Sequence, residues 1–160
     1  MLDPVPISRT GYNKIKEELG KLEEELTEVK QTVAEARELG DLKENGAYIY
    51  GRERQGFIVG KIQGLQGILS RADIVDCTTV EPDRAHFGTV VTLLDLDTQR
   101  KIKYQLVGPD ESDFHDIGLS IHSPVGEAIL GCVVGDQVTV SIPRGDRNLE
   151  VLAIERSTID

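Results

Sequence analysis

The sequence of 160 residues has little from which to build an aromatic or disulfide-bonded interior. It contains no tryptophan, three phenylalanines, four tyrosines and two cysteines. The cysteines, Cys77 and Cys132, lie far apart and form no CxxC pair, so neither a disulfide framework nor a zinc ribbon is indicated. The aliphatic residues permit a modest core, which makes a broad, aromatic-lined ligand cavity a poor expectation.

Long apolar runs are also missing. No stretch of about 20 apolar residues is available to cross a bilayer, and residues 1–8 carry neither the basic nor the apolar region of a secretion signal. We therefore expect a cytoplasmic protein without a membrane partner.

Positive charge is scarce. The 18 basic residues are outnumbered by 28 acidic ones, and the formal net charge is -10. Because phosphate binding relies on lysine and arginine, this deficit excludes broad, self-sufficient binding to nucleic acid. A local contact from a few arginines is still compatible with the composition.

The first half of the chain contains two heptad seams. Apolar residues recur at alternating steps of four and three over residues 15–36 and again over 58–72. Ser8 suits the N-cap of a first helix over residues 9–39, and Gly40 suits its C-terminal end. Because an isolated amphipathic helix is rarely stable in water, each seam should cover the other. The pattern predicts an antiparallel coiled-coil hairpin.

Six glycines interrupt the second helical pattern between residues 46 and 67. Each costs about 1 kcal/mol relative to alanine inside a helix. Gly60, Gly64 and Gly67 fall two residues after seam positions, hence on the outer face. They either admit a close-packed neighbour or weaken the helix, and both interpretations stay open.

After Asp76 the pattern changes to period-two alternation punctuated by turn residues. Ser123 and Pro124 suit the start of a short helix over residues 125–130. Strands are expected over residues 88–96, 101–107, 137–142 and 149–154. The predicted class is α+β, with a helical hairpin over residues 1–78 and a small antiparallel sheet domain with one short helix over residues 79–160.

Two carboxylates three residues apart, Asp41 and Glu44, lie where the hairpin should reverse. One interpretation is structural: Asp41 caps the second helix and Glu44 completes a capping box. The other is chemical, since exposed carboxylates bind Mg²⁺, which takes one or two protein ligands and keeps several waters. Two acids do not form a tight site alone, so a partner would complete it. The two roles are compatible.

The segment Gly40–Asn45, with Tyr48 and residues 52–55 after it, closely resembles the tip motif of the Gre transcript cleavage factors, the family of GreA and GreB. The sparsely basic hairpin is more similar to the GreA type. The resemblance extends over the whole chain through matching segments at residues 87–89, 107–108, 111 and 121–124.

This resemblance implies a partner, bacterial RNA polymerase. The hairpin would enter the secondary channel of the polymerase, and an FKBP-like sheet domain would dock at the channel rim. Asp41 and Glu44 would share a Mg²⁺ ion with the polymerase active centre and position the water that cleaves the 3′ end of backtracked nascent RNA, rescuing arrested complexes. The resemblance implies no cofactor for the isolated protein and no enzymatic activity of its own.

The resemblance also implies two contact surfaces. Arg37 and Arg52 would bind the extruded RNA, because the planar arginine fork suits phosphate, although both would also suit solvated ion pairs with neighbouring glutamates. His122, Ser123 and Pro124 would contact the polymerase. The chain departs from the family pattern at Lys43, Gly46-Ala47 and His122.

Two other functions stay open at the level of sequence. An FKBP-like proline isomerase or chaperone needs convergent aromatics, and the chain beyond residue 57 offers only Phe87, Tyr104 and Phe114. A Gre-like relative that occupies the channel would inhibit the polymerase without promoting cleavage, against which the acid pair Asp41 and Glu44 argues. We expect a monomer.

Overall fold

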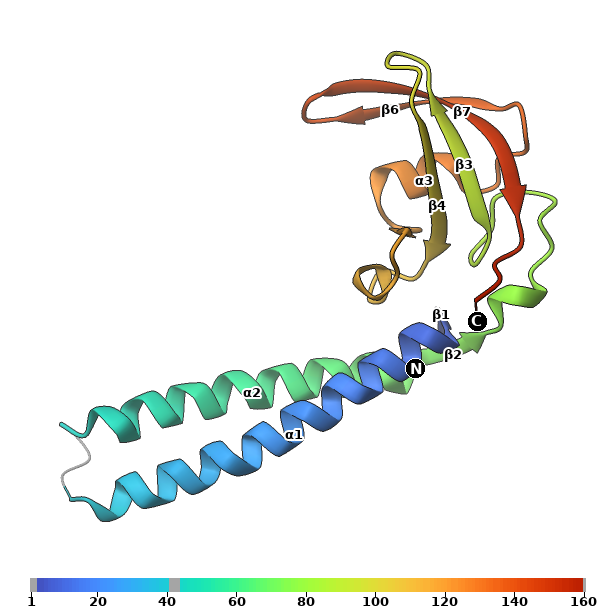
Figure 1. Ribbon diagram of the computed structural model, residues 1–160. Coiled ribbons are helices and arrows are strands. Elements are labelled where there is room, and N and C mark those ends of the chain that lie inside the picture. Colours follow the sequence, from blue (N-terminus) through green and yellow to red (C-terminus); the bar gives the residue numbers. More distant parts are fainter. Residues whose placement is uncertain (1–2, 41–43, 160) are drawn as a thin grey trace. The chain divides into compact units, whose positions relative to one another are not determined.

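The computed structural model describes residues 3–40 and 44–159 (Figure 1). Its contacts divide the chain into two units. Lys14–Ser70 form one unit, and Met1–Asn13 together with Arg71–Asp160 form the other. None of the described helices is long and apolar enough to cross a membrane.

The first unit is a pair of antiparallel helices. α1 spans Arg9–Glu38 and α2 spans Gly46–Arg71. The predicted ends of the first helix are confirmed: Ser8 Oγ accepts a hydrogen bond from the Gly11 N–H at 3.0 Å, and Gly40 has a φ of +119°, which favours glycine. Both ends therefore follow from local capping chemistry.

The predicted heptad seams do face each other. Leu22, Ile58 and Ile62 form the buried centre of the hairpin, and half-buried leucines and Val29 surround them. Gly51 lies so close to α1 that a Cβ atom there would be 2.7 Å from Val33 Cγ2. By contrast, a Cβ at Gly60, Gly64 or Gly67 would meet no described atom within 4 Å. Those three glycines lie on the outer face without a close-packed neighbour among the described residues.

The ends of the two helices furthest from the turn continue into a short parallel strand pair. β1, Val5–Ser8, pairs with β2, Ala72–Val75, in the register Val5 to Ala72. The prediction that Ala72 ends the helical seam is therefore wrong, because the helix stops at Arg71. The pairing joins segments far apart in the sequence, so local periodicity does not encode it.

The sheet of the second unit has the strand order β5-β4-β3-β7-β6. All neighbours are antiparallel except β4 and β5, which pair in parallel. The α+β class is confirmed, and β5 is a strand that the sequence did not predict. Its strands are β3 Val90–Asp95, β4 Lys101–Val107, β5 Gly118–Ser120, β6 Gln137–Ile142 and β7 Gly145–Glu155.

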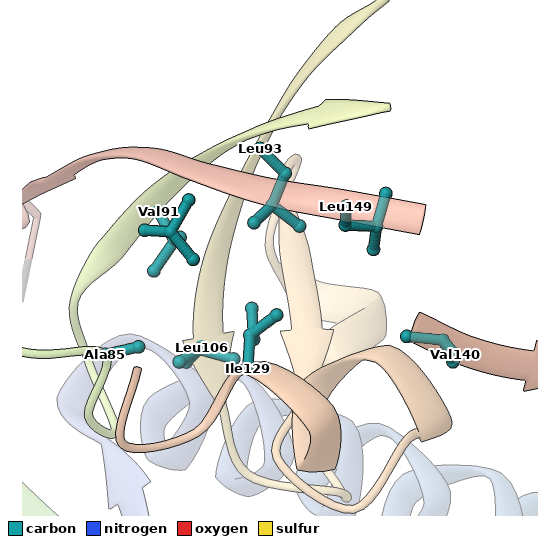
Figure 2. Packing of buried hydrophobic residues seen from close by; sticks show 8 residues of the cluster. Ala85, Val91, Leu93, Leu106, Ile129, Val140 and Leu149 are labelled. Atoms are coloured by element: carbon teal, nitrogen blue, oxygen red, sulfur yellow. The ribbon is translucent and has the colours of Figure 1, made fainter. Parts of the chain in front are cut away.

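Three short helices accompany the sheet. The predicted helix is α3, Pro124–Ile129, and two 3-10 turns lie at Cys77–Thr79 and Ser112–Phe114. Figure 2 shows Ile129 of α3 pointing towards Leu93 and Leu149 on the sheet. The buried cluster consists of Ala85, Val91, Leu93, Leu106, Ile129, Val140, Leu149 and Val151. The core is aliphatic, as the composition predicted.

Candidate functional site: the hairpin tip and the start of α3

Asn45 organises the described part of the hairpin tip. Its Oδ1 accepts a hydrogen bond from the Tyr48 N–H at 3.1 Å and so caps α2. Its Nδ2 donates to the Ala36 carbonyl at 2.6 Å, in the last turn of α1. The interpretation that Asp41 caps the second helix is therefore wrong: α2 begins at Gly46, and the cap is Asn45.

Of the two predicted acidic residues, Glu44 lies within the described part of the structure and Asp41 does not. Glu44 is exposed, and no hydrogen bond or ion pair joins it to the described part of the chain. Asp41 and Lys43 lie outside the described residues. No group of three histidine, cysteine, aspartate or glutamate side chains within residues 3–40 and 44–159 is arranged to hold a metal ion.

The two predicted RNA-binding arginines are both exposed. The Arg37 guanidinium lies over the Tyr48 ring, 5.7 Å from its centroid, so a cation–π contact joins the last turn of α1 to the first turn of α2. Within the described segments neither Arg37 nor Arg52 forms an ion pair. The glutamate pairing that the sequence left open for them is thus not observed there.

A different arginine bridges the helices further from the turn. Arg54 Nε donates to Glu25 Oε1 at 3.0 Å, and the two side chains also form an ion pair. Arg54 and Lys61 additionally flank the exposed Phe57 ring, at 5.5 and 5.0 Å from its centroid. The sequence analysis missed this cluster, although cations three residues before and four after an aromatic residue on a helix signal it.

The predicted polymerase-contact residues lie at the start of α3. Ser123 Oγ accepts from the Gly126 N–H at 3.1 Å and donates to the Ser120 carbonyl at 2.6 Å, so Ser123 is the predicted cap. His122 and Pro124, on either side, are exposed. Gly126 admits no side chain, because a Cβ there would lie 2.0 Å from the Ser120 oxygen. The geometry fixes the backbone of this segment and leaves its flanking side chains accessible.

Glu111 is a fully buried carboxylate whose role the sequence did not reveal. It accepts hydrogen bonds from the Ser8 N–H at 3.0 Å, the Gly108 N–H at 3.1 Å and the Ser8 hydroxyl, and His115 Nε2 lies 2.8 Å away. Burial raises the pKa of Glu111, but the hydrogen bonds from His115, Ser8 and Gly108 together hold it below its ordinary value. Gly11 leaves room for this carboxylate, since a Cβ there would be 2.6 Å from Glu111 Oε1.

A groove of about 500 Å³ in the second unit is the place to look for an isomerase-like site. Among the described residues that line it, Phe114 is the one aromatic, and Lys103, Glu155 and Arg156 make much of the wall charged. Since desolvation of a prolyl bond needs convergent apolar rings, this groove does not favour the isomerase alternative.

Comparison with known families matches both parts of the chain. Residues 5–74 match the model described as "Transcription elongation factor, N-terminal", and residues 80–156 match "Transcription elongation factor, GreA/GreB, C-term". Together the two matches cover both helices and the five-stranded sheet.

Individual relatives match over nearly their whole length. The transcription elongation factor GreA of Maridesulfovibrio salexigens is 44% identical over 153 residues, covering 96% of each chain. The GreA of Desulfotalea psychrophila is 44% identical over 156 residues, covering 97% of each. Among solved structures, GreA factor homolog 1 (Gfh1) of Thermus thermophilus is 29% identical with a TM-score of 0.45, covering 94% of this chain and 98% of that one.

Proposed function

The chain belongs to the GreA/GreB family of transcription elongation factors, and we propose that it stimulates the cleavage activity of bacterial RNA polymerase on backtracked RNA. The observation that carries this proposal is the exposure of Glu44 and Arg37 together at the turn end of a long two-helix hairpin. An exposed acid and an exposed cation at the end of a narrow element are suited to a site that another protein completes.

The acids would act as ligands. In this proposal the hairpin enters the secondary channel, and Asp41 and Glu44 contribute oxygen donors to a Mg²⁺ ion that the polymerase also holds. A bound Mg²⁺ in such a site activates water and neutralises charge on a phosphodiester. The exposure of Glu44 supports this assignment, as does the fact that its side chain forms no hydrogen bond or ion pair within the described part of the chain. The chain would not cut RNA alone, because two carboxylates leave most of the ion's coordination unfilled.

The arginines would hold the RNA. Arg37 and Arg52 are exposed on adjacent helices near the turn, where a guanidinium donates two parallel hydrogen bonds to a phosphate. We assign both to the nascent RNA 3′ end. Two such contacts also explain how a chain with a net charge of -10 approaches RNA, since the other charges need not face it.

The start of α3 would dock on the polymerase. His122 and Pro124 are exposed on either side of the Ser123 cap, so they supply contact area on a backbone that the cap has already ordered. Such preordering lowers the entropic cost of association. We propose that one copy of the chain serves one polymerase.

Halted, backtracked polymerase complexes test the proposal. Addition of the protein with Mg²⁺ should accelerate the release of short 3′ RNA fragments, and the protein alone should release none. Glu44→Gln and Asp41→Asn should remove the acceleration because they remove a charged ligand without changing side-chain size. Glu24→Gln, at an exposed acid of α1 more than a dozen residues before the turn, is the matched control. Slower transcription without fragment release would instead identify an inhibitor, and full stimulation by both tip variants would reject the mechanism.

A further inference from the structure

Asn45 makes two hydrogen bonds of opposite direction at the hairpin tip. Its Oδ1 accepts from the Tyr48 N–H at 3.1 Å, and its Nδ2 donates to the Ala36 carbonyl at 2.6 Å. The first bond caps α2, and the second ties the start of α2 to the last turn of α1. One side chain therefore connects the two helices.

Helix capping explains only the first of these bonds. Serine, threonine, aspartate and asparagine all cap helices well. A carboxylate has no proton to donate at neutral pH. A hydroxyl can donate, but from the same oxygen that accepts the capping bond, whereas the amide presents a second polar atom further along the side chain. Asparagine is thus the cap residue that also reaches Ala36, and the second bond requires an explanation beyond the stability of α2.

The position of that bond in the chain supplies the explanation. Ala36 is 3% exposed on the seam, and its carbonyl also accepts from the Leu39 N–H at 3.2 Å, so it is a fixed point of α1. Arg37 directly follows Ala36, and Glu44 directly precedes Asn45. The bond therefore fixes the two backbone points from which the proposed RNA ligand and the proposed metal ligand project.

We propose that Asn45 is a positioning residue: its side-chain amide holds the ends of α1 and α2 together and so sets the placement of Glu44 relative to Arg37. This inference rests on the proposed cleavage function. Groups that orient a metal-binding side chain without touching the metal change metal affinity or activity by about 10- to 100-fold when they are removed. Loss of the Asn45–Ala36 bond would displace the Glu44 carboxylate in the same way, so that the shared Mg²⁺ ion would be bound more weakly.

Three variants distinguish the Asn45–Ala36 hydrogen bond from the capping hydrogen bond between Asn45 and the Tyr48 N–H. Asn45→Asp keeps an acceptor for the Tyr48 N–H and has no proton to donate to Ala36. Asn45→Ser keeps the acceptor, but its shorter side chain withdraws the donor from the Ala36 carbonyl. Asn45→Ala loses both. The serine variant also controls for the negative charge that aspartate adds. Each variant is compared with the unaltered chain and with Glu44→Gln. Helicity is measured by circular dichroism at 222 nm, and affinity for polymerase by competition with the labelled unaltered chain. Fragment release is measured across a Mg²⁺ titration.

We expect the aspartate and serine variants to keep their affinity for polymerase and to lose part of their stimulation of fragment release. Asn45→Asp and Asn45→Ser should keep their helicity and their affinity for polymerase within about twofold. Both should also need about 10- to 100-fold more Mg²⁺ for half-maximal fragment release, or release fragments that much more slowly. The inference is overturned if both stimulate like the unaltered chain at every Mg²⁺ concentration, if the aspartate variant alone is impaired, or if stimulation falls only in proportion to polymerase affinity. Absence of stimulation by the unaltered chain would instead reject the cleavage function, and this inference with it.

Discussion

The Glu111 carboxylate accepts a hydrogen bond at 3.0 Å from the backbone N–H of Ser8, 103 positions earlier in the chain. Both residues are fully buried. Ser8 is the last residue of β1 and the cap of α1, so this contact joins two distant segments of the unit that contains the sheet. Glu111 is therefore a structural carboxylate, in contrast to the exposed Glu44.

Replacement of Glu111 should destabilise the unit that contains the sheet. Glu111→Gln keeps the size of the side chain but turns an amide NH₂ towards the Ser8 or Gly108 N–H, leaving a buried donor without an acceptor. We expect a loss of about 1–3 kcal/mol in the free energy of unfolding, measured by denaturant titration. Glu155→Gln, at an exposed glutamate, should change that free energy by less than about 0.5 kcal/mol. Equal stability of the two variants would contradict the assignment.

The same carboxylate should make stability depend on acid. Its pKa in the folded chain lies below the ordinary value, so its contribution is fully present above the unfolded pKa. The contribution should disappear as the pH falls through the lower, folded pKa. Unfolding free energies measured between about pH 6 and pH 3 should decline for the unaltered chain and decline less for Glu111→Gln. His115 is the titratable neighbour, and His115→Gln tests whether its own charge causes the slope.

Two glycines of α2 should respond oppositely to alanine. Gly60→Ala introduces a Cβ into open space, so it should raise stability by about 0.5–1 kcal/mol through helix propensity. Gly51→Ala places a Cβ 2.7 Å from Val33 Cγ2, and the resulting strain should cost about 1–3 kcal/mol. Denaturant unfolding followed at 222 nm should therefore rank Gly60→Ala above Gly51→Ala. The reverse order would mean that the helices are not this close at Gly51.

The Tyr48 ring should matter through Arg37. Tyr48→Phe keeps an aromatic face for the guanidinium, and Tyr48→Leu removes it. A cation–π contact at an exposed site is worth about 0.5–1 kcal/mol, so the leucine variant should stimulate fragment release about two- to fivefold less, while the phenylalanine variant should match the unaltered chain. Arg37→Ala sets the maximum effect. Full activity of Tyr48→Leu beside a defective Arg37→Ala would show that the ring does not orient the arginine.

Local patterns predicted most of the fold. The heptad steps of residues 15–36 and 58–69 describe the observed hairpin. The strands over residues 101–107 and 137–142 were predicted with the observed bounds. These features depend on periodicity and capping, which neighbouring residues determine. β1, β2 and β5 were missed because they contain four, four and three residues. Such segments are too short for a periodic signal and are defined by distant partners.

The site was predicted less completely, for two reasons. Aspartate followed by glutamate three residues later is a common helix start, which made the cap of α2 one of the two interpretations of Asp41. Asn45 satisfies the same chemistry four residues further on. The contacts between Glu111 and Ser8 were not predictable, since these two residues are 103 positions apart. The exposed positions of Glu44, Arg37 and Arg52 agree with expectation, and their roles stay proposals.

The β1–β2 pairing and the Asn45–Ala36 bond tie the two helices together at opposite ends. A shift of one helix along the other by a heptad would break both the strand pairing and the Asn45–Ala36 hydrogen bond. The length of the hairpin is therefore fixed by the number of residues between these two contacts. A longer hairpin would require matched seven-residue insertions in both helices. An insertion in one helix alone would distort that helix or break one of the two contacts.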